Sequence, residues 1–171
     1  MTRKLLQMAV LIGSVTATGW ILADSHKYGE GKSLPQVSNA KWKAECGSCH
    51  TLYHPGLLPE RSWRKIMSGL DQHFGENASL DPLTGKEITE FLATNSADRV
   101  ENRRSAKISQ SIPAQSTPLR ISEMAWFVRK HDEVRADTWK LPKIGSPANC
   151  TACHSGADKG DFAEARIRIP R

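Results

Sequence analysis

All four cysteines of this chain lie in two five-residue motifs, Cys-Gly-Ser-Cys-His at residues 46–50 and Cys-Thr-Ala-Cys-His at residues 150–154. Two thiols separated by two residues lie about one turn apart, which matches the separation of the two vinyl groups of a haem. The histidine that follows directly can bind the haem iron. The pattern therefore predicts two covalently bound haem c groups. The thioether-forming residues would be Cys46, Cys49, Cys150 and Cys153, and the proximal iron ligands would be His50 and His154.

Paired cysteines have three other common uses, and each fits this chain less well. A zinc site made from both pairs would leave the two adjacent histidines unexplained, and the pairs stand about 100 residues apart. Two disulfides are the usual expectation for four cysteines in an exported protein, but here each pair is followed at once by a histidine. A thioredoxin-like redox motif needs a strand–helix–strand scaffold, which surrounds neither pair. Haem attachment is the interpretation that uses all six residues.

An electron-transfer haem needs a second axial ligand, which is usually a histidine or a methionine. For the first haem we predict His73, because it follows the apolar positions Trp63, Ile66 and Leu70 at helical spacing and so faces the same interior. Met67 shares this stripe but fits ordinary core packing better. His54 is only four residues from His50, too close in sequence to cross easily to the opposite haem face.

The second haem has fewer candidates for this ligand. Only 17 residues follow His154, and they include neither methionine nor histidine, so the ligand must come from upstream. We predict His131, on the apolar stripe of a helix expected at residues 122–134, and Met124 is its rival on the same side. A five-coordinate iron is the alternative, and it would indicate peroxidase-like or gas-binding chemistry. His26 falls in a polar leader and is expected to be solvated.

The elements that must position these residues are helices, since no segment shows convincing strand alternation. A helix is expected over residues 59–74. A second should begin after an N-cap at Asp81, with a capping-box pattern from Thr84 to Glu87, and should end near Asn95. The prediction is a mainly α fold of two small haem c domains, at residues 41–95 and 119–171. A polar leader at 26–40 precedes them, and a polar linker at 96–118 joins them.

The first 25 residues are typical of an export signal. Arg3 and Lys4 precede a moderately apolar stretch over residues 5–23, and cleavage is expected after Ala23 or Ser25. An uncleaved membrane anchor is the alternative, since about 20 apolar residues can span a bilayer. Either way the remaining chain should lie outside the cytoplasm, in the bacterial periplasm. This location argues against nucleic acid as a partner.

The chain is basic, with a formal net charge of +6 that falls to +5 without residues 1–25, since Arg3, Lys4 and Asp24 leave. Two groups of arginines could attract an acidic partner protein, or could simply form solvated faces. They are Arg99, Arg103 and Arg104 in the linker, and Arg166, Arg168 and Arg171 in the tail.

Beyond the two motifs, the sequence resembles the bacterial dihaem cytochrome c family of bis-histidyl periplasmic electron-transfer proteins. The matching segments are residues 45–50 (ECGSCH), 57–63 (LLPERSW), 73–81 (HFGENASLD), 120–123 (RISE) with His131, 149–154 (NCTACH), 160–162 (GDF) and 169–171 (IPR). The resemblance implies a mostly helical two-domain fold, one haem per domain and histidine ligation on both sides of each iron. It also implies redox partners, either a small high-spin cytochrome or a membrane cytochrome b.

These observations predict a one-electron carrier without a substrate pocket of its own. The competing prediction is a haem enzyme, either peroxidase-like or oxidising sulfur compounds, with one open or displaceable iron site. Such an enzyme needs catalytic side chains beside the iron, and the chain is short for the usual peroxidase architecture and offers no free cysteine as an alternative ligand. A haem-based sensor would need a signalling domain, for which the sequence gives no sign.

Overall fold

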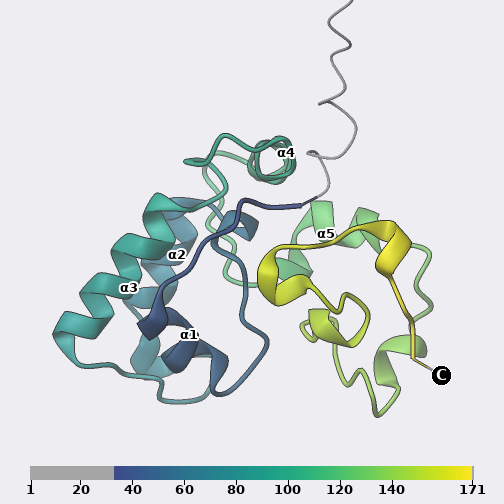
Figure 1. Ribbon diagram of the computed structural model, residues 1–171, viewed down its shortest axis with the longest axis horizontal. Coiled ribbons are helices and arrows are strands. Elements are labelled where there is room, and N and C mark those ends of the chain that lie inside the picture. Colours follow the sequence, from purple (N-terminus) through teal and green to yellow (C-terminus); the bar gives the residue numbers. More distant parts are fainter. Residues whose placement is uncertain (1–32, 171) are drawn as a thin grey trace, which may run out of the picture.

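The computed structural model describes residues 33–170, and its regular structure there is helical (Figure 1). The α-helices are α1 (Ala40–Gly47), α2 (Glu60–Met67), α3 (Pro82–Thr94), α4 (Arg103–Gln110) and α5 (Ala125–Lys130). Within residues 33–170 there are isolated β-bridges but no strand, so the predicted mainly α fold class is confirmed. The predicted signal segment, His26 and Arg171 lie outside the described residues.

Helices α1, α2 and α3 pack together in the first half of the chain around Trp42, Ile88 and Leu92, each of which is at most 2% exposed. The expected start of α3 is confirmed, because the Asp81 carboxylate accepts hydrogen bonds from the first backbone N–H groups of the helix. The expected capping box is wrong. Glu87 instead forms an ion pair with Lys41 of α1, with 2.8 Å between Oε2 and Nζ.

The helix expected over residues 59–74 is shorter in the structure. Helix α2 ends at Met67, and the N–H groups of Ser68 and Gly69 donate to carbonyls of its last turn. A separate 3₁₀ turn follows at Leu70–Gln72. Glycine has a low helix propensity, and Gly69 leaves the helical conformation with φ −130° and ψ 29°. His73 therefore lies in a loop and not on the apolar stripe of α2.

The segment expected to be a polar linker contains helix α4. Asn102 caps this helix by accepting hydrogen bonds from the backbone N–H groups of Arg104 and Ser105. Ser105 and Ile108 of α4 are fully buried, and Ile112 is 8% exposed. The segment therefore supplies part of the apolar core. Ile108 and Ile112 belong to a single cluster of buried side chains that also includes Trp42 and Phe127.

The second half of the chain has little regular structure besides α5. The helix expected over residues 122–134 is confined to Ala125–Lys130, because Met124 is extended and His131 leaves the helical conformation. Short 3₁₀ turns follow at Thr138–Lys140, Cys150–Ala152, Ala157–Lys159 and Glu164–Arg166. The chain before α1 lies against this half, and the N–H of Leu34 donates to the carbonyl of Gly160. No helix within residues 33–170 is long and apolar enough to cross a membrane.

Candidate functional site

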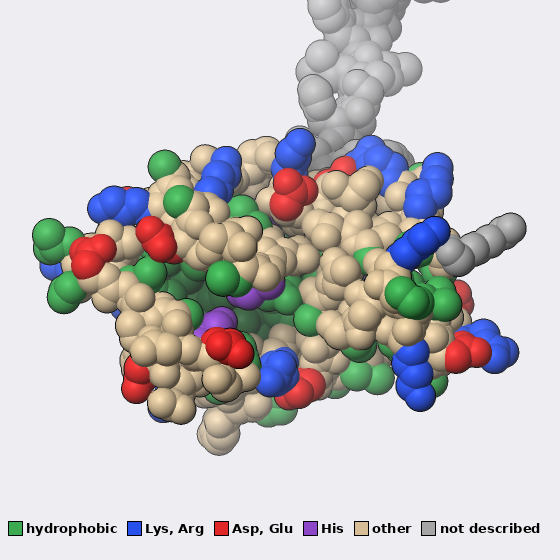
Figure 2. Space-filling view, turned by 90° about the horizontal axis from the view of Figure 1, so that it is seen from below, with side chains coloured by type: hydrophobic (Ala, Val, Ile, Leu, Met, Phe, Trp, Pro, Cys, Tyr) green, Lys and Arg blue, Asp and Glu red, His purple; other side chains and the backbone are tan. Residues whose placement is uncertain are grey.

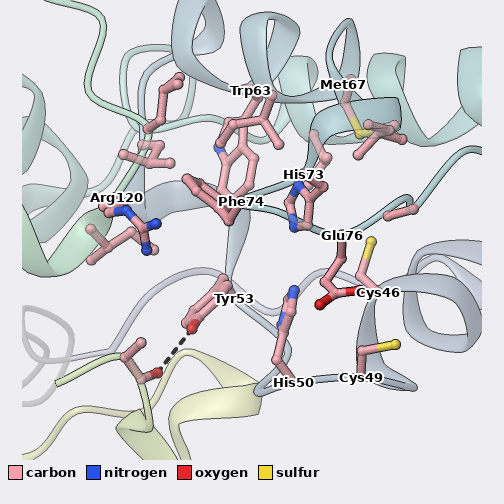
Figure 3. A pocket seen from close by; sticks show the side chains of 18 of the residues that line it. Cys46, Cys49, His50, Tyr53, Trp63, Met67, His73, Phe74, Glu76 and Arg120 are labelled. Carbon is pink, nitrogen blue, oxygen red and sulfur yellow. Dashed lines mark hydrogen bonds between the residues drawn. The ribbon is translucent and has the colours of Figure 1, made fainter. Parts of the chain in front are cut away.

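Two cavities enclose the chemically active residues that the sequence singles out. The first cavity, of about 700 Å³, is lined by the residues of the first CxxCH motif and by His73 (Figure 3). The second cavity, of about 760 Å³, is lined by Cys150, Cys153 and His154 together with His131. Figure 2 shows a hollow on one face of the molecule with an apolar floor and histidine side chains inside it. Volumes of this size are typical of sites for small molecules and cofactors.

The first cavity lies between α1, α2 and the loop that carries His73. The last turn of α1 places Cys46, and the chain leaving this helix places Cys49 and His50. Trp63 and Met67 of α2 form the apolar wall, and the indole N–H of Trp63 donates to the Pro55 carbonyl at 2.7 Å, which fixes its ring.

His50 and His73 face each other across the first cavity, with 6.1 Å between ring centroids and 27° between ring planes. The Nδ1–H of His50 donates to the carbonyl of Thr51 at 2.7 Å. Because a carbonyl can only accept, this bond leaves the Nε2 lone pair of His50 free. Burial lowers the pKa of His73, with smaller effects from His50 and Arg120, and so favours a neutral imidazole with a lone pair to donate.

A strained turn holds His73 in place. Phe74 has a positive φ of 54°, which is unusual for a residue other than glycine, and Gly75 follows with φ 103°. The guanidinium of Arg120 lies 4.1 Å from the centroid of the Phe74 ring and so packs the turn against the second half of the chain. Strained backbone of this kind persists where the surrounding structure fixes it, often at functional sites.

The second cavity is built from short turns and aromatic rings. A 3₁₀ turn at Cys150–Ala152 carries its first cysteine, and Cys153 and His154 follow directly. The ring of Phe127 stacks on His131 with 4.0 Å between centroids, and Trp139 lies 5.9 Å from the same imidazole. Phe162 contacts His154 edge-on with a centroid separation of 5.5 Å.

His131 and His154 also face each other with 6.1 Å between ring centroids, but their ring planes are nearly perpendicular, at 83°. The Nδ1–H of His131 donates to the carbonyl of Phe127 at 2.9 Å, which again leaves the Nε2 lone pair free. Burial is the main cause that lowers the pKa of His154, and the neighbouring His131 lowers it further. The free Nε2 of His131 and the imidazole of His154 can therefore both bind a metal ion.

The separation within each histidine pair fits a metal ion held between two imidazoles. Two metal–nitrogen bonds of about 2 Å, with each ring centroid about 1.1 Å beyond its nitrogen, place the centroids roughly 6 Å apart. Both pairs have this separation, and both have two cysteines and an apolar wall beside them. The residues of each cavity therefore fit a covalently attached haem.

Other candidates named from the sequence are placed elsewhere. His54 is 2% exposed and uses both ring nitrogens, since its Nε2–H donates to the Pro35 carbonyl at 2.7 Å and its Nδ1 accepts from the N–H of Gly56 at 3.0 Å. It has no lone pair left for a metal. Met124 lies in the apolar core and lines neither cavity, whereas Met67 lines the first cavity.

The thiols themselves have properties that argue against the rival uses of cysteine pairs. All four cysteines are free, and within residues 33–170 no cluster of three or more metal-binding side chains occurs. Burial raises the pKa of Cys46 and of Cys150 to about 11. Redox-active cysteines act as thiolates and usually lie where the pKa is lowered.

The two cavities share one wall, made of Ile121, Phe127, Pro147 and Cys150, which line both. Two hydrogen bonds join the halves of the chain beside this wall. The Tyr53 hydroxyl donates to the carbonyl of Ala148 at 2.9 Å, and the Thr51 and Thr151 hydroxyls lie 3.3 Å apart. The two sites are thus direct neighbours.

Sequence reasoning missed several residues that line the cavities. Glu76 and Tyr53 line the first, and Arg104 lines the second although its segment was expected to be a linker. A signal for Arg104 existed in Asn102, which is a good N-cap residue at the start of a helical stretch. Leu58, Trp63 and Phe74 line the first cavity, whereas Leu57 lines the second.

Comparison with known proteins gives consistent matches. The sequence profile of the dihaem cytochrome c family matches residues 42–162. A dihaem cytochrome c from Rhodobacter sphaeroides is 42% identical, with a TM-score of 0.67 over 74% of this chain and 98% of that one. A dihaem cytochrome c from Shewanella baltica is 40% identical, with a TM-score of 0.63 over 80% of this chain and 95% of that one. A search among curated proteins finds no match.

Proposed function

The chain belongs to the dihaem cytochrome c family, and from this premise we propose that it carries single electrons between redox partners in the periplasm. Its cofactors are two haem c groups. The proposal assigns covalent attachment to Cys46, Cys49, Cys150 and Cys153, and axial ligation to His50 with His73 and to His131 with His154.

The observation that carries this proposal is the pair of facing histidines in each cavity, both with ring centroids 6.1 Å apart. When bound, a haem supplies a one-electron iron couple, and two imidazole ligands favour the oxidised state relative to a histidine–methionine pair. The backbone carbonyls that bind Nδ1 of His50 and of His131 orient these rings and keep Nε2 available. Both potentials should therefore be low for a cytochrome.

Carriage of electrons is favoured over catalysis because, in the proposed ligation, histidines would occupy both axial positions of each haem. A haem enzyme needs an open or displaceable position for its substrate, with an acid or base beside it. The histidines that face His50 and His154 occupy the places that a substrate would need. An enzyme remains the alternative for any site whose distal histidine proves not to bind the iron.

The shared wall supports rapid electron transfer within the molecule. Cys150 belongs to the second motif but also lines the first cavity, so the two redox centres are separated by little more than side chains. We propose that one centre accepts an electron from a donor while the other delivers it to an acceptor. The family resemblance suggests a small high-spin cytochrome or a membrane cytochrome b as partner.

The arginines expected to attract an acidic partner are partly engaged within the molecule. Arg99 pairs with Glu60, and Arg166 pairs with Asp161. Arg104 is half-buried beside the second cavity. Neither group of arginines therefore offers three unpaired cations on one face, and any electrostatic attraction of a partner must come from a wider set of charges.

Carbon monoxide tests the proposal directly, because it binds reduced haem only where an axial position is open. The holoprotein is reduced with dithionite, and optical spectra are recorded before and after addition of the gas. We expect two low-spin haems whose spectra do not change within minutes. Rapid carbon monoxide binding, or a high-spin spectrum before the gas is added, would show an open site and overturn the proposal for that haem.

A further inference from the structure

A half-buried cation beside the second cavity makes no side-chain hydrogen bond or ion pair within residues 33–170. Arg104 lines this cavity, and its Nε is inaccessible to solvent and makes no hydrogen bond. Within residues 33–170 its guanidinium forms no ion pair, and its one ring contact is with Phe162 at 5.9 Å. Neighbouring Arg103 and Lys107 also line the cavity but are exposed to solvent.

An unpaired guanidinium in such a position is costly for the fold. It carries five N–H donors and cannot be neutralised at ordinary pH, and its buried Nε–H is left without an acceptor. Burial is also the main cause that lowers the pKa of Arg104. The charges of Glu164 and Asp161 act on Arg104, but neither carboxylate forms an ion pair or hydrogen bond with it, and Asp161 is already bound by Arg166 and by the N–H of Ala163. A carboxylate brought into the cavity would give this Nε–H an acceptor.

We propose that Arg104 binds a propionate of the haem in the second cavity. A propionate is a carboxylate, and the planar guanidinium can donate two parallel hydrogen bonds to it. The haem's two propionates are the anionic groups that it would bring into this apolar space. Arg104 is then a positioning residue, which orients the cofactor and sets the electron affinity of its iron through the local charge.

The first cavity has no equivalent residue. Its lining contains one cation, Arg120, whose guanidinium stacks on Phe74 and pairs with Glu123 at 3.4 Å. The lining also contains the carboxylates of Glu45 and Glu76. The second cavity is instead lined by the cations Arg103, Arg104, Lys107 and Lys130, with the carboxylates Glu133 and Glu164. Because reduction adds a negative charge, the more positive cavity should favour it, and the second haem should be reduced first.

The test is a potentiometric titration, monitored by optical spectra, of the holoprotein and of four variants. Arg104→Gln removes the buried charge, Arg104→Lys keeps the charge without the planar fork, and Arg103→Gln removes an exposed charge one residue away. His131→Met identifies the second haem, because it changes a proposed ligand of that iron only. We expect Arg104→Gln to weaken electron binding at the second haem about tenfold, which is roughly 59 mV for one electron.

Arg103→Gln should change the same affinity less than threefold, and Arg104→Lys should fall between the two. Equal shifts in Arg104→Gln and Arg103→Gln, or no shift in either, would overturn the role of Arg104. Reduction of the first haem before the second in the unmodified protein would overturn the order. The inference rests on the proposed function only in that both haems titrate as one-electron centres. A high-spin spectrum of the unmodified protein would reject the proposed function instead, independently of Arg104.

Discussion

The two cavities contain the same motif and the same separation of histidine rings, but the chain builds them differently. The first CxxCH motif leaves a regular helix, and its imidazole lies nearly parallel to that of His73, at 27°. The second motif forms a 3₁₀ turn, and its imidazole is nearly perpendicular to that of His131, at 83°. The motif therefore determines which cofactor is bound, whereas the surrounding elements determine how the ligands are oriented around it.

The two regions also differ in what holds them together. Around the first cavity, helices α2 and α3 pack on each other and bury Ile88 and Leu92. Around the second, most of the chain is turns and loops, and its aromatic side chains face the cavity itself. Leu92 lines the first cavity but Ile88 does not, so we expect the packing of α2 on α3 to survive loss of the cofactor better than the second region does.

The largest expected effect comes from removing the attachment of one haem at a time. In the double variant Cys150→Ser with Cys153→Ser, residues 121–170 should lose protection from amide exchange, while α2 and α3 keep theirs. The matched variant Cys46→Ser with Cys49→Ser should leave helical structure in both regions. Hydrogen exchange measured by mass spectrometry distinguishes the two. Equal loss of protection in both variants would contradict the difference in cores.

Exchanging a distal ligand should change one redox centre and spare the other. His73→Met and His131→Met each replace an imidazole by a thioether, which favours the reduced iron. We expect one potential to rise on the order of 100 mV in each variant, a modest part of the range that axial ligands can set. A potentiometric titration of each variant gives the shift. Unchanged potentials in both would show that neither histidine is a ligand.

The buried His54 should make the contact between the two regions sensitive to pH. Burial lowers its pKa from the ordinary 6.5, so the unfolded chain binds a proton more tightly than the folded protein does. Stability should therefore fall as the pH drops through about 6.5. The variant His54→Gln loses part of this dependence and about 1 kcal/mol of stability from a lost hydrogen bond.

Urea denaturation of the holoprotein at pH 7.5 and at pH 5.5 measures this effect. The difference between the free energies of unfolding at the two pH values is determined for the unmodified protein and for His54→Gln. Comparing the two differences cancels the contributions from the other histidines. An identical pH dependence in both proteins would show that His54 does not titrate in this range.

The smallest expected effect concerns the hydrogen bond from Tyr53 to the carbonyl of Ala148, which joins the two halves. Tyr53→Phe keeps the ring and removes the bond, so it should cost about 0.5–1.5 kcal/mol in thermal or urea denaturation and leave the haem spectra unchanged. Thr151→Val removes the other hydrogen bond between the halves, which is exposed to solvent and should contribute less than about 0.5 kcal/mol. A larger loss of stability in Thr151→Val than in Tyr53→Phe would show that the Tyr53 hydrogen bond is not the stronger contact between the halves.

Much of the site could be predicted because it depends on local spacing. The two CxxCH motifs place their own cysteines and histidines at a fixed spacing. The start of α3 at Asp81 was predictable for the same reason, since a cap involves neighbouring residues only.

The rest depends on contacts between distant segments. Helices α2 and α5 were expected to be longer, because apolar periodicity continues past Ser68 and Lys130 although the chain turns there. Helix α4 was expected to be part of a linker, because its few apolar residues do not reveal that Ile108 fills the core. Arg104 showed only a charge in the sequence, and the cavity beside it depends on residues about 50 positions later.

Electron paramagnetic resonance of the oxidised holoprotein tests the central claim most directly. Nearly parallel imidazoles split the iron d orbitals that they overlap, whereas perpendicular imidazoles leave these orbitals nearly degenerate, so the two arrangements give low-spin signals of different shape. We predict one rhombic low-spin signal from the site of His50 and His73, and one strongly anisotropic low-spin signal from the site of His131 and His154. A high-spin signal would contradict histidine ligation on both sides of that iron. Two low-spin signals of the same shape would contradict the different ring orientations at the two sites.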